Sequence, residues 1–254
     1  MQIVTDSGTD VGFTPLQMKE YDVHVVPLTV TLGGKSYREG IDIKPDEFYD
    51  LLDKAEGMPV TSQPAAGEFA LVYRELAKKD PDILSIHISS GLSGTVNSAI
   101  AGAAMVPEAR VTVIDTKTLS VPSGWQVEAA ARAVKAGWEP QQVLDLVTRI
   151  GNDTNVLYTL KELKYLIHGG RISHLKGLLA SVLNIKPIIG VEKERGTYVT
   201  LGQARSFTSA VKAAVEQVRR RVGAGVPLRA QVVHAANPEG AQQLVEQVAS
   251  GFKV

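Results

Sequence analysis

Hydroxyl and glycine residues are concentrated in one short stretch of the chain, Ser89 to Thr95 (SSGLSGT). The stretch follows an apolar run at 83–89 that is typical of a strand, and it precedes a helix expected to begin near Thr95 or Val96. Backbone N–H groups and hydroxyls at a helix N-terminus bind anionic oxygen groups. Serine, threonine and glycine are also the usual residues of capped turns, so composition alone leaves both interpretations open.

A second hydroxyl cluster, Thr61-Ser62-Gln63-Pro64, lies between two predicted helices. Alone it is a weak signal, because these residues could simply cap the helix after Pro64. Asp6 and Ser7 end the first predicted strand, and we expect them at the same sheet edge as Ser93. Ligands of open α/β proteins bind at that edge.

Two arginines follow positions where an element ends. Arg171 lies in Gly169-Gly170-Arg171-Ile172-Ser173, just beyond a predicted helix, and Arg205 closes a predicted strand. Isolated arginines mostly lie on solvated surfaces. The guanidinium geometry also suits a phosphate or an acidic partner, so both residues are candidates for such a contact.

A serine esterase is the alternative reading. Ser93, Asp115 and His234 occur in the order Ser, Asp, His of the α/β hydrolases, and each follows or ends a predicted strand. However, Thr95 replaces the second glycine of the G-x-S-x-G turn. His234 falls within an apolar run, which favours a histidine in a buried strand over a mobile base.

The composition argues against several functional classes. The chain of 254 residues has 27 basic and 27 acidic side chains, which gives no broad attraction for nucleic acid or an anionic membrane. There is no cysteine, and the five histidines are scattered, so we expect no metal site. We find no basic, apolar leader and no apolar run of the roughly 18 to 20 residues that span a bilayer. We therefore expect a cytoplasmic protein without stable membrane insertion.

The first part of the chain alternates strands and helices. The predicted strands are 2–5, 23–32, 83–89 and 111–114, and the predicted helices are 42–54, 68–79 and 140–150. Runs that are apolar on both faces are typical of a parallel sheet covered by helices. Pro27 predicts an edge or an interruption of pairing within 23–32.

The pattern changes after Gly151-Asn152-Asp153. The run 156–168 starts strand-like and becomes helical, and 187–205 predicts a hairpin around Glu194-Arg195-Gly196. A helix over 207–222, a strand over 228–235 and a helix over 238–249 complete the prediction. The fold class is therefore α/β in two lobes: residues 1–152 form an N-terminal lobe with a mainly parallel sheet, and 153–254 form a C-terminal α+β lobe with antiparallel pairing.

The motifs together resemble those of the DegV proteins, the fatty-acid-binding carriers of bacterial fatty acid kinase. The matching features, in chain order, are Val4-Thr5-Asp6-Ser7, Val26-Pro27-Leu28, Thr61-Ser62-Gln63-Pro64, Ser90-Gly91-Leu92-Ser93-Gly94-Thr95, Val113-Ile114-Asp115-Thr116, Gly169-Gly170-Arg171-Ile172-Ser173, Ile185-Lys186-Pro187-Ile188, Arg205 and His234-Ala235. They cover nearly the whole chain, and this many motifs in this order make a strong signal.

The resemblance implies a long-chain fatty acid between the two lobes. Its carboxylate would be held by Thr61 and Ser93, with Ser62, Gly94 and Thr95 in the same binding site. A separate kinase subunit would make the acyl phosphate from ATP, and Arg171 and Arg205 would face that partner. The resemblance implies no catalytic residue and no cofactor on this chain.

In one respect the sequence departs from the family pattern. Family members usually continue past the equivalent of Phe252 with another strand and a histidine in a Gly-Pro-Gly context, whereas this sequence ends at Val254. In the family that histidine lies near the carboxylate. Without that histidine, binding of the carboxylate would depend on the hydroxyl residues named above. It is therefore the least secure of the properties that the resemblance implies.

Overall fold

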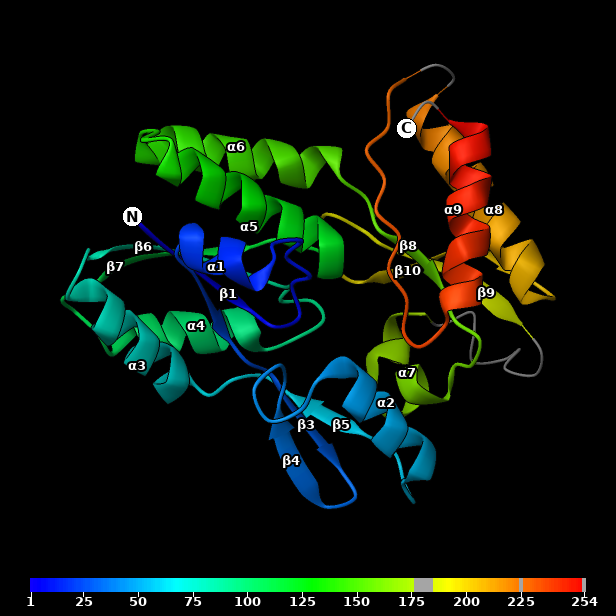
Figure 1. Ribbon diagram of the computed structural model, residues 1–254, viewed down its shortest axis with the longest axis horizontal. Coiled ribbons are helices and arrows are strands. Elements are labelled where there is room, and N and C mark those ends of the chain that lie inside the picture. The colour runs from blue at the N-terminus through cyan, green and yellow to red at the C-terminus, as the bar shows by residue number, and fades with distance from the viewer. Residues whose placement is uncertain (176–184, 224–225, 253–254) are drawn as a thin grey trace. The chain divides into compact units, whose positions relative to one another are not determined.

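The computed structural model describes residues 1–175, 185–223 and 226–252 (Figure 1). The chain forms two compact units. The first consists of Met1–Val156 together with Glu192–Thr197, and the second of Leu157–Val191 together with Tyr198–Val254.

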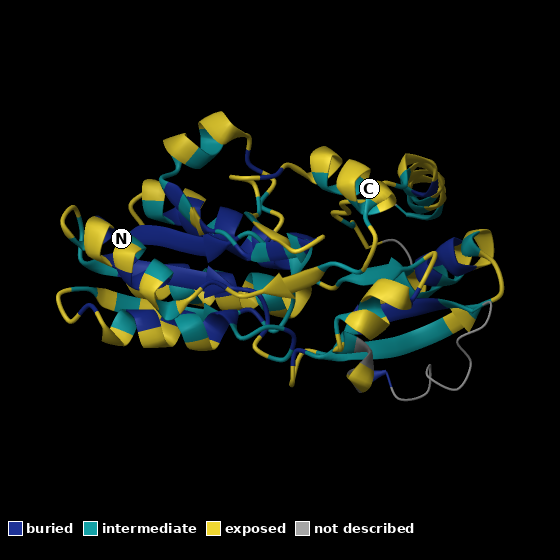
Figure 2. Ribbon diagram, turned by 90° about the horizontal axis from the view of Figure 1, so that it is seen from below, coloured by how far each residue is buried: buried dark blue, intermediate teal, exposed yellow. Residues whose placement is uncertain are grey.

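A parallel sheet forms the centre of the first unit. Its strands are β1 (Gln2–Asp6), β2 (Val23–Val26), β6 (Asp82–His87) and β7 (Arg110–Asp115), in the order β2-β1-β6-β7. All three pairings are parallel. Every residue of β1 is buried, and the central strands are dark blue in Figure 2. The structure thus confirms the predicted parallel sheet with two covered faces.

Helices cover both faces of this sheet (Figure 1). On one face α1 (Pro15–Glu20), α5 (Ser120–Lys135) and α6 (Pro140–Asp153) enclose an apolar core. On the other face α3 (Ala66–Ala77) and α4 (Thr95–Ala104) enclose a second. Successive residues of a strand point to opposite faces, so Ile3 contributes to the first core and Val4 to the second.

The predicted strand 23–32 is two strands in two different sheets. β2 ends at Val26, and β3 (Thr29–Leu32) belongs to an antiparallel sheet with the order β4-β3-β5. Pro27 lies at the break, because proline has no N–H to donate to a ladder. The other strands of this sheet, β4 (Lys35–Arg38) and β5 (Val60–Ser62), were not predicted. The predicted helix over 42–54 is present as α2 (Pro45–Lys54).

The second unit contains an antiparallel sheet packed against a helix. Its strands are β8 (Leu157–Thr159), β9 (Lys186–Val191) and β10 (Tyr198–Ala204), in the order β10-β9-β8. Its helical elements are α7 (Lys164–His168), the 3₁₀ turn η1 (Arg171–His174), α8 (Phe207–Val222) and α9 (Pro238–Gly251). Ile188 of β9 packs with Ala210 and Ala214 of α8. The predicted hairpin and the predicted antiparallel pairing are both present.

The predicted strand over 228–235 is wrong. Residues 226–234 have no regular secondary structure, and among the described residues no strand pairs with them. An apolar run becomes a strand only where another strand satisfies its backbone groups. His234 is accordingly exposed, and its Nδ1 accepts a hydrogen bond from Asn237 N at 3.3 Å, so the expectation of a histidine in a buried strand is also wrong.

Gly102 allows α3 and α4 to approach closely. A methyl group on Gly102 would lie 2.6 Å from Phe69 Cβ and 2.7 Å from Ala66 O. We predict that Gly102→Ala lowers the free energy of unfolding by about 1–3 kcal/mol, because the helices must move apart. The control is Gly67→Ala in α3, where a methyl group meets nothing within 4 Å and stability should be unchanged or rise by up to about 1 kcal/mol. Urea denaturation measures both, and equal midpoints would contradict the prediction.

Candidate functional site

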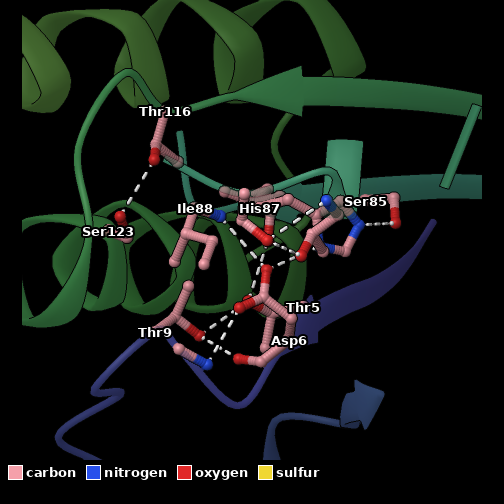
Figure 3. A network of polar contacts seen from close by, with 12 residues as sticks. Thr5, Asp6, Thr9, Ser85, His87, Ile88, Thr116 and Ser123 are labelled. Carbon is pink, nitrogen blue, oxygen red and sulfur yellow. Dashed lines mark hydrogen bonds and ion pairs between the residues drawn. The ribbon is translucent and has the colours of Figure 1, made fainter. Parts of the chain in front are cut away.

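A buried carboxylate joins the carboxyl ends of β1 and β6 (Figure 3). Asp6 Oδ1 accepts a hydrogen bond from Gly8 N at 2.9 Å. Asp6 Oδ2 lies 2.9 Å from His87 Nδ1 and accepts a second bond from Ile88 N at 3.1 Å. The side chains of Asp6 and His87 are both fully buried. Of the two polar residues predicted at the end of the first strand, Asp6 therefore meets the end of β6, but inside the protein, whereas the Ser7 hydroxyl donates to Glu39 Oε2 at 2.7 Å and accepts from Leu28 N at 2.9 Å.

The network continues from His87 towards α3. His87 Nε2 lies 2.6 Å from Ser85 Oγ, and Ser85 Oγ lies 2.7 Å from the Tyr73 hydroxyl. Burial raises the pKa of Tyr73 to about 12. The Asp6–His87–Ser85 chain has the connectivity of a hydrolase triad. Ser85 is fully buried and its hydroxyl also contacts Tyr73, so this serine meets no substrate and the network is structural.

Ser89 begins the turn that leads from β6 to α4. Its N–H donates to Thr118 O at 2.7 Å, and its carbonyl accepts from Leu92 N and Ser93 N, both at 3.0 Å. Its hydroxyl donates to Gly196 O at 2.8 Å and accepts from Gly91 N at 3.1 Å. One buried residue thus fixes both ends of the turn that carries Ser93.

The predicted residues Ser93, Gly94 and Thr95 form the N-terminus of α4. Gly94 is the N-cap and provides no side chain, so the Ser93 hydroxyl accepts from Thr95 N at 3.4 Å. The hydroxyls of Ser93 and Thr95 lie 2.8 Å apart. Ser93 is partly exposed while Thr95 is buried. The first N–H groups of a helix lack intrahelical acceptors, so this terminus can bind an anionic oxygen.

The predicted residues Thr61 and Ser62 lie in the exposed strand β5, where Thr61 pairs with Val30 of β3. Gln63 connects this segment to the helix terminus, because a methyl group on Gly94 would lie 2.9 Å from Gln63 Nε2. The structure therefore brings the 61–63 segment beside the turn that carries Ser93. Gln63 belongs to the motif Thr61-Ser62-Gln63-Pro64, but nothing in the sequence predicted its contact with Gly94.

The two predicted arginines lie in the second unit, whereas the hydroxyl residues lie in the first. Arg171 is the first residue of η1, and one guanidinium nitrogen donates to Gly169 O at 2.6 Å. Arg205 directly follows β10 and is exposed.

The residues of the esterase alternative have other partners. The Ser93 hydroxyl contacts Thr95, and His234 accepts from Asn237 N. Burial raises the pKa of Asp115, but hydrogen bonds from Ser90 and Lys117 lower it by a larger amount. The pKa of Asp115 therefore lies below its ordinary value. No described contact joins any two of Ser93, Asp115 and His234.

The described residues contain neither a metal-binding cluster nor a helix that could span a membrane. In those parts of the chain, no group of three or more histidine, aspartate or glutamate residues could hold a metal ion. In the same residues, no helix is both long enough and apolar enough to cross a bilayer.

Comparison with known proteins gives a family match over residues 1–254, to the model described as an uncharacterised protein of the DegV family. The chain belongs to the DegV family. A DegV domain-containing protein of Deinococcus radiodurans is 36% identical over 248 residues, which are 98% of this chain and 84% of that protein. The resemblance found in the sequence is therefore confirmed.

Solved structures of the DegV family share the fold. A crystal structure of DegV from Bacillus subtilis, described as a fatty acid binding protein, is 29% identical with a TM-score of 0.87, over 99% of this chain and 90% of that one. A DegV family protein from Thermus thermophilus, described by its fatty acid binding, is 33% identical with a TM-score of 0.78, over 88% of this chain and 78% of that one. Both support the predicted α/β fold class.

The buried network predicts a large effect from a small change. Asp6→Asn replaces one carboxylate oxygen with an N–H₂ group, so one of the three N–H donors around Asp6 loses its acceptor. We expect the free energy of unfolding to fall by about 1–3 kcal/mol, measured by urea denaturation. Asp50→Asn on the exposed face of α2 is the control and should change it by less than about 0.5 kcal/mol. An equally small effect at Asp6 would show that the carboxylate has no stabilising role.

Proposed function

We propose that this DegV-family chain binds a long-chain fatty acid and holds its carboxylate at the Ser93 turn and the β5 segment. One observation carries the proposal: Gln63 contacts Gly94, so two hydroxyl-rich segments lie side by side at a helix N-terminus. The fatty acid binding of the Bacillus subtilis and Thermus thermophilus proteins supports the choice of ligand.

The proposed head-group site uses neutral donors. The hydroxyls of Thr61 and Ser93 donate to the carboxylate, and the proposed site also includes Ser62 of β5 and the residues Gly94 and Thr95 at the start of α4. Hydrogen bonds to a charged acceptor are stronger than neutral ones, so a few of them orient the head group. The absence of a charge pair in this set keeps the carboxylate available for release.

The proposed role is that of a carrier, not of an enzyme acting alone. Ser93 is partly exposed and has no described contact with a histidine, whereas Ser85, which does contact one, is buried. Most of the affinity comes from the acyl chain, at about 0.8 kcal/mol per buried methylene, before the losses of association. No cofactor is required for binding.

The proposed partner is a separate ATP-dependent kinase subunit that converts the bound acid to an acyl phosphate. Arg171 and Arg205 are the proposed contacts, because a guanidinium suits phosphate and carboxylate groups of a partner or nucleotide. Such a carrier would work in the cytoplasm, where ATP is available.

One prediction of the proposed function concerns the binding of the fatty acid carboxylate. Protein purified without added lipid should release a C14 to C18 acid in stoichiometric amount into an organic extract, measured by mass spectrometry. The Thr61→Ala, Ser93→Ala variant should release at least about tenfold less, because two charge-assisted hydrogen bonds are lost. Thr31→Ala, Ser98→Ala is the control, since it removes two hydroxyls from the same sheet and helix. An empty extract from the unmodified protein would overturn the proposal.

Another prediction of the proposed function concerns phosphorylation of the bound acid by the partner kinase. Arg205→Ala should leave the lipid content unchanged and reduce phosphorylation of the bound acid about tenfold, measured with ³²P-labelled ATP and the purified kinase subunit of fatty acid kinase. Arg171→Ala should act in the same direction. Arg221→Ala, at the exposed end of α8, serves as the control. Phosphorylation at the control rate by both variants would remove the arginines from the partner site.

A further inference from the structure

The tip of the β9–β10 hairpin, Glu192–Thr197, belongs to the first unit, although the two strands belong to the second. The tip is closed by its own hydrogen bonds. Glu192 N donates to Thr197 O at 3.0 Å, and Gly196 N donates to Glu192 O at 2.9 Å. Arg195 N donates to Glu192 Oε1 at 2.6 Å. These bonds hold the Gly196 carbonyl in a defined position.

The Gly196 carbonyl is bound by Ser89, the residue that begins the proposed head-group turn. Ser89 is fully buried, and its hydroxyl donates to Gly196 O at 2.8 Å. The same hydroxyl accepts from Gly91 N at 3.1 Å. The Ser89 side chain is therefore held between the hairpin tip and the turn.

The tip and the turn approach closely around the Ser89 side chain, with no room for a side chain on Gly196 or Gly91. Gly196 has a φ of +66°, and a methyl group on it would lie 1.9 Å from Ser89 Oγ and 3.1 Å from Lys117 Cα. A methyl group on Gly91 would lie 2.5 Å from Arg195 O and 2.8 Å from Gly196 O. A positive φ is common for glycine in hairpin turns, but the short distances of both hypothetical methyl groups show that the contact itself leaves no room for a side chain on Gly91 or Gly196.

Ser89 also determines where Ser93 lies. Its carbonyl accepts from both Leu92 N and Ser93 N, so a shift of the Ser89 backbone moves the whole turn. Two hydrogen bonds hold Ser89 in place. Its hydroxyl donates to Gly196 O in the hairpin tip, and its N–H donates to Thr118 O in the segment that follows β7.

We propose that Ser89 and Gly196 are positioning residues for the head-group site: the hairpin tip holds the Ser93 turn in the form that binds a carboxylate. Neither residue contacts the ligand in this scheme. The inference rests on the proposed fatty acid binding and adds to it a structural requirement outside the hydroxyl residues.

The test compares two alanine substitutions in one hairpin. Gly196→Ala should weaken binding of palmitate about tenfold, measured by displacement of a fluorescent fatty acid, because the tip must leave the Ser89 hydroxyl. Gly202→Ala in β10 is the control, since its methyl group would meet Ile188 Cδ1 at an ordinary 3.5 Å. The amide NMR signals of Ser93 and Thr95 should shift in Gly196→Ala and stay in place in Gly202→Ala. A purely structural glycine would lower the thermal midpoint without moving these signals in the folded protein.

Ser89→Ala and the double variant complete the test. Ser89→Ala alone should weaken palmitate binding severalfold, and it carries the test where Gly196→Ala does not fold. The double variant should bind palmitate more tightly than Gly196→Ala alone, because removing Oγ removes the closest clash. Wild-type affinity and unmoved signals in folded Gly196→Ala or Ser89→Ala would overturn the proposal. Failure of the unmodified protein to bind palmitate would instead overturn the proposed function, while the amide signals would still report whether the tip positions the turn.

Discussion

A carboxylate removed from water is costly unless donors replace its hydration, and Asp6 is fully buried at the end of β1. Three donors around it make the arrangement stable: the N–H groups of Gly8 and Ile88, and His87 Nδ1. Two of these belong to the end of β6 and one to the loop after β1. The carboxylate therefore sets the register at which both strands end, and Ile88 immediately precedes the turn that carries the proposed binding residues. Apolar packing on both faces holds the sheet together, but this buried charge determines how its carboxyl edge is shaped.

The proposed site depends on a series of hydrogen bonds that leads from Asp6 to Ser93. Asp6 fixes Ile88, the next residue Ser89 fixes the start of the turn, and Ser93 takes its place through the Ser89 carbonyl. The hairpin tip acts on the same residue through Gly196 O. Ser93 therefore needs few contacts of its own, and the residue is partly exposed. A site of neutral donors gains most from this arrangement, because weak donors orient a head group only when they are held in place beforehand.

Local sequence patterns predicted the elements that carry these residues. Continuous apolar runs predicted the strands of the parallel sheet, and helical spacing predicted α6 and α8, because burial on one or both faces leaves a periodic signal. β4 and β5 left none, since they are short and mostly exposed. The run 228–235 gave a strand signal without a partner to pair with, which no local pattern reveals. Local patterns could not predict the contacts of the site for the same reason. Asp6 and His87 are 81 positions apart in the sequence, and the hydrogen bond from Ser89 to Gly196 joins residues 107 positions apart. The DegV motifs supplied the candidate binding residues, which remain a prediction, but they did not indicate the contacts of Ser89, Gln63 and Gly196 around them.

The distribution of serines also bears on why a second protein is proposed for the chemistry. An activated serine needs both a base within hydrogen-bond reach and access to a substrate. Ser85 has the base, since its hydroxyl lies 2.6 Å from His87 Nε2, but it has no access. Ser93 has the access but contacts Thr95 in place of a base. Because each serine lacks what the other has, neither meets both requirements, and a bound acid at the Ser93 turn would be oriented without being attacked. In the proposed function, the groups that transform the acid come from a separate kinase subunit.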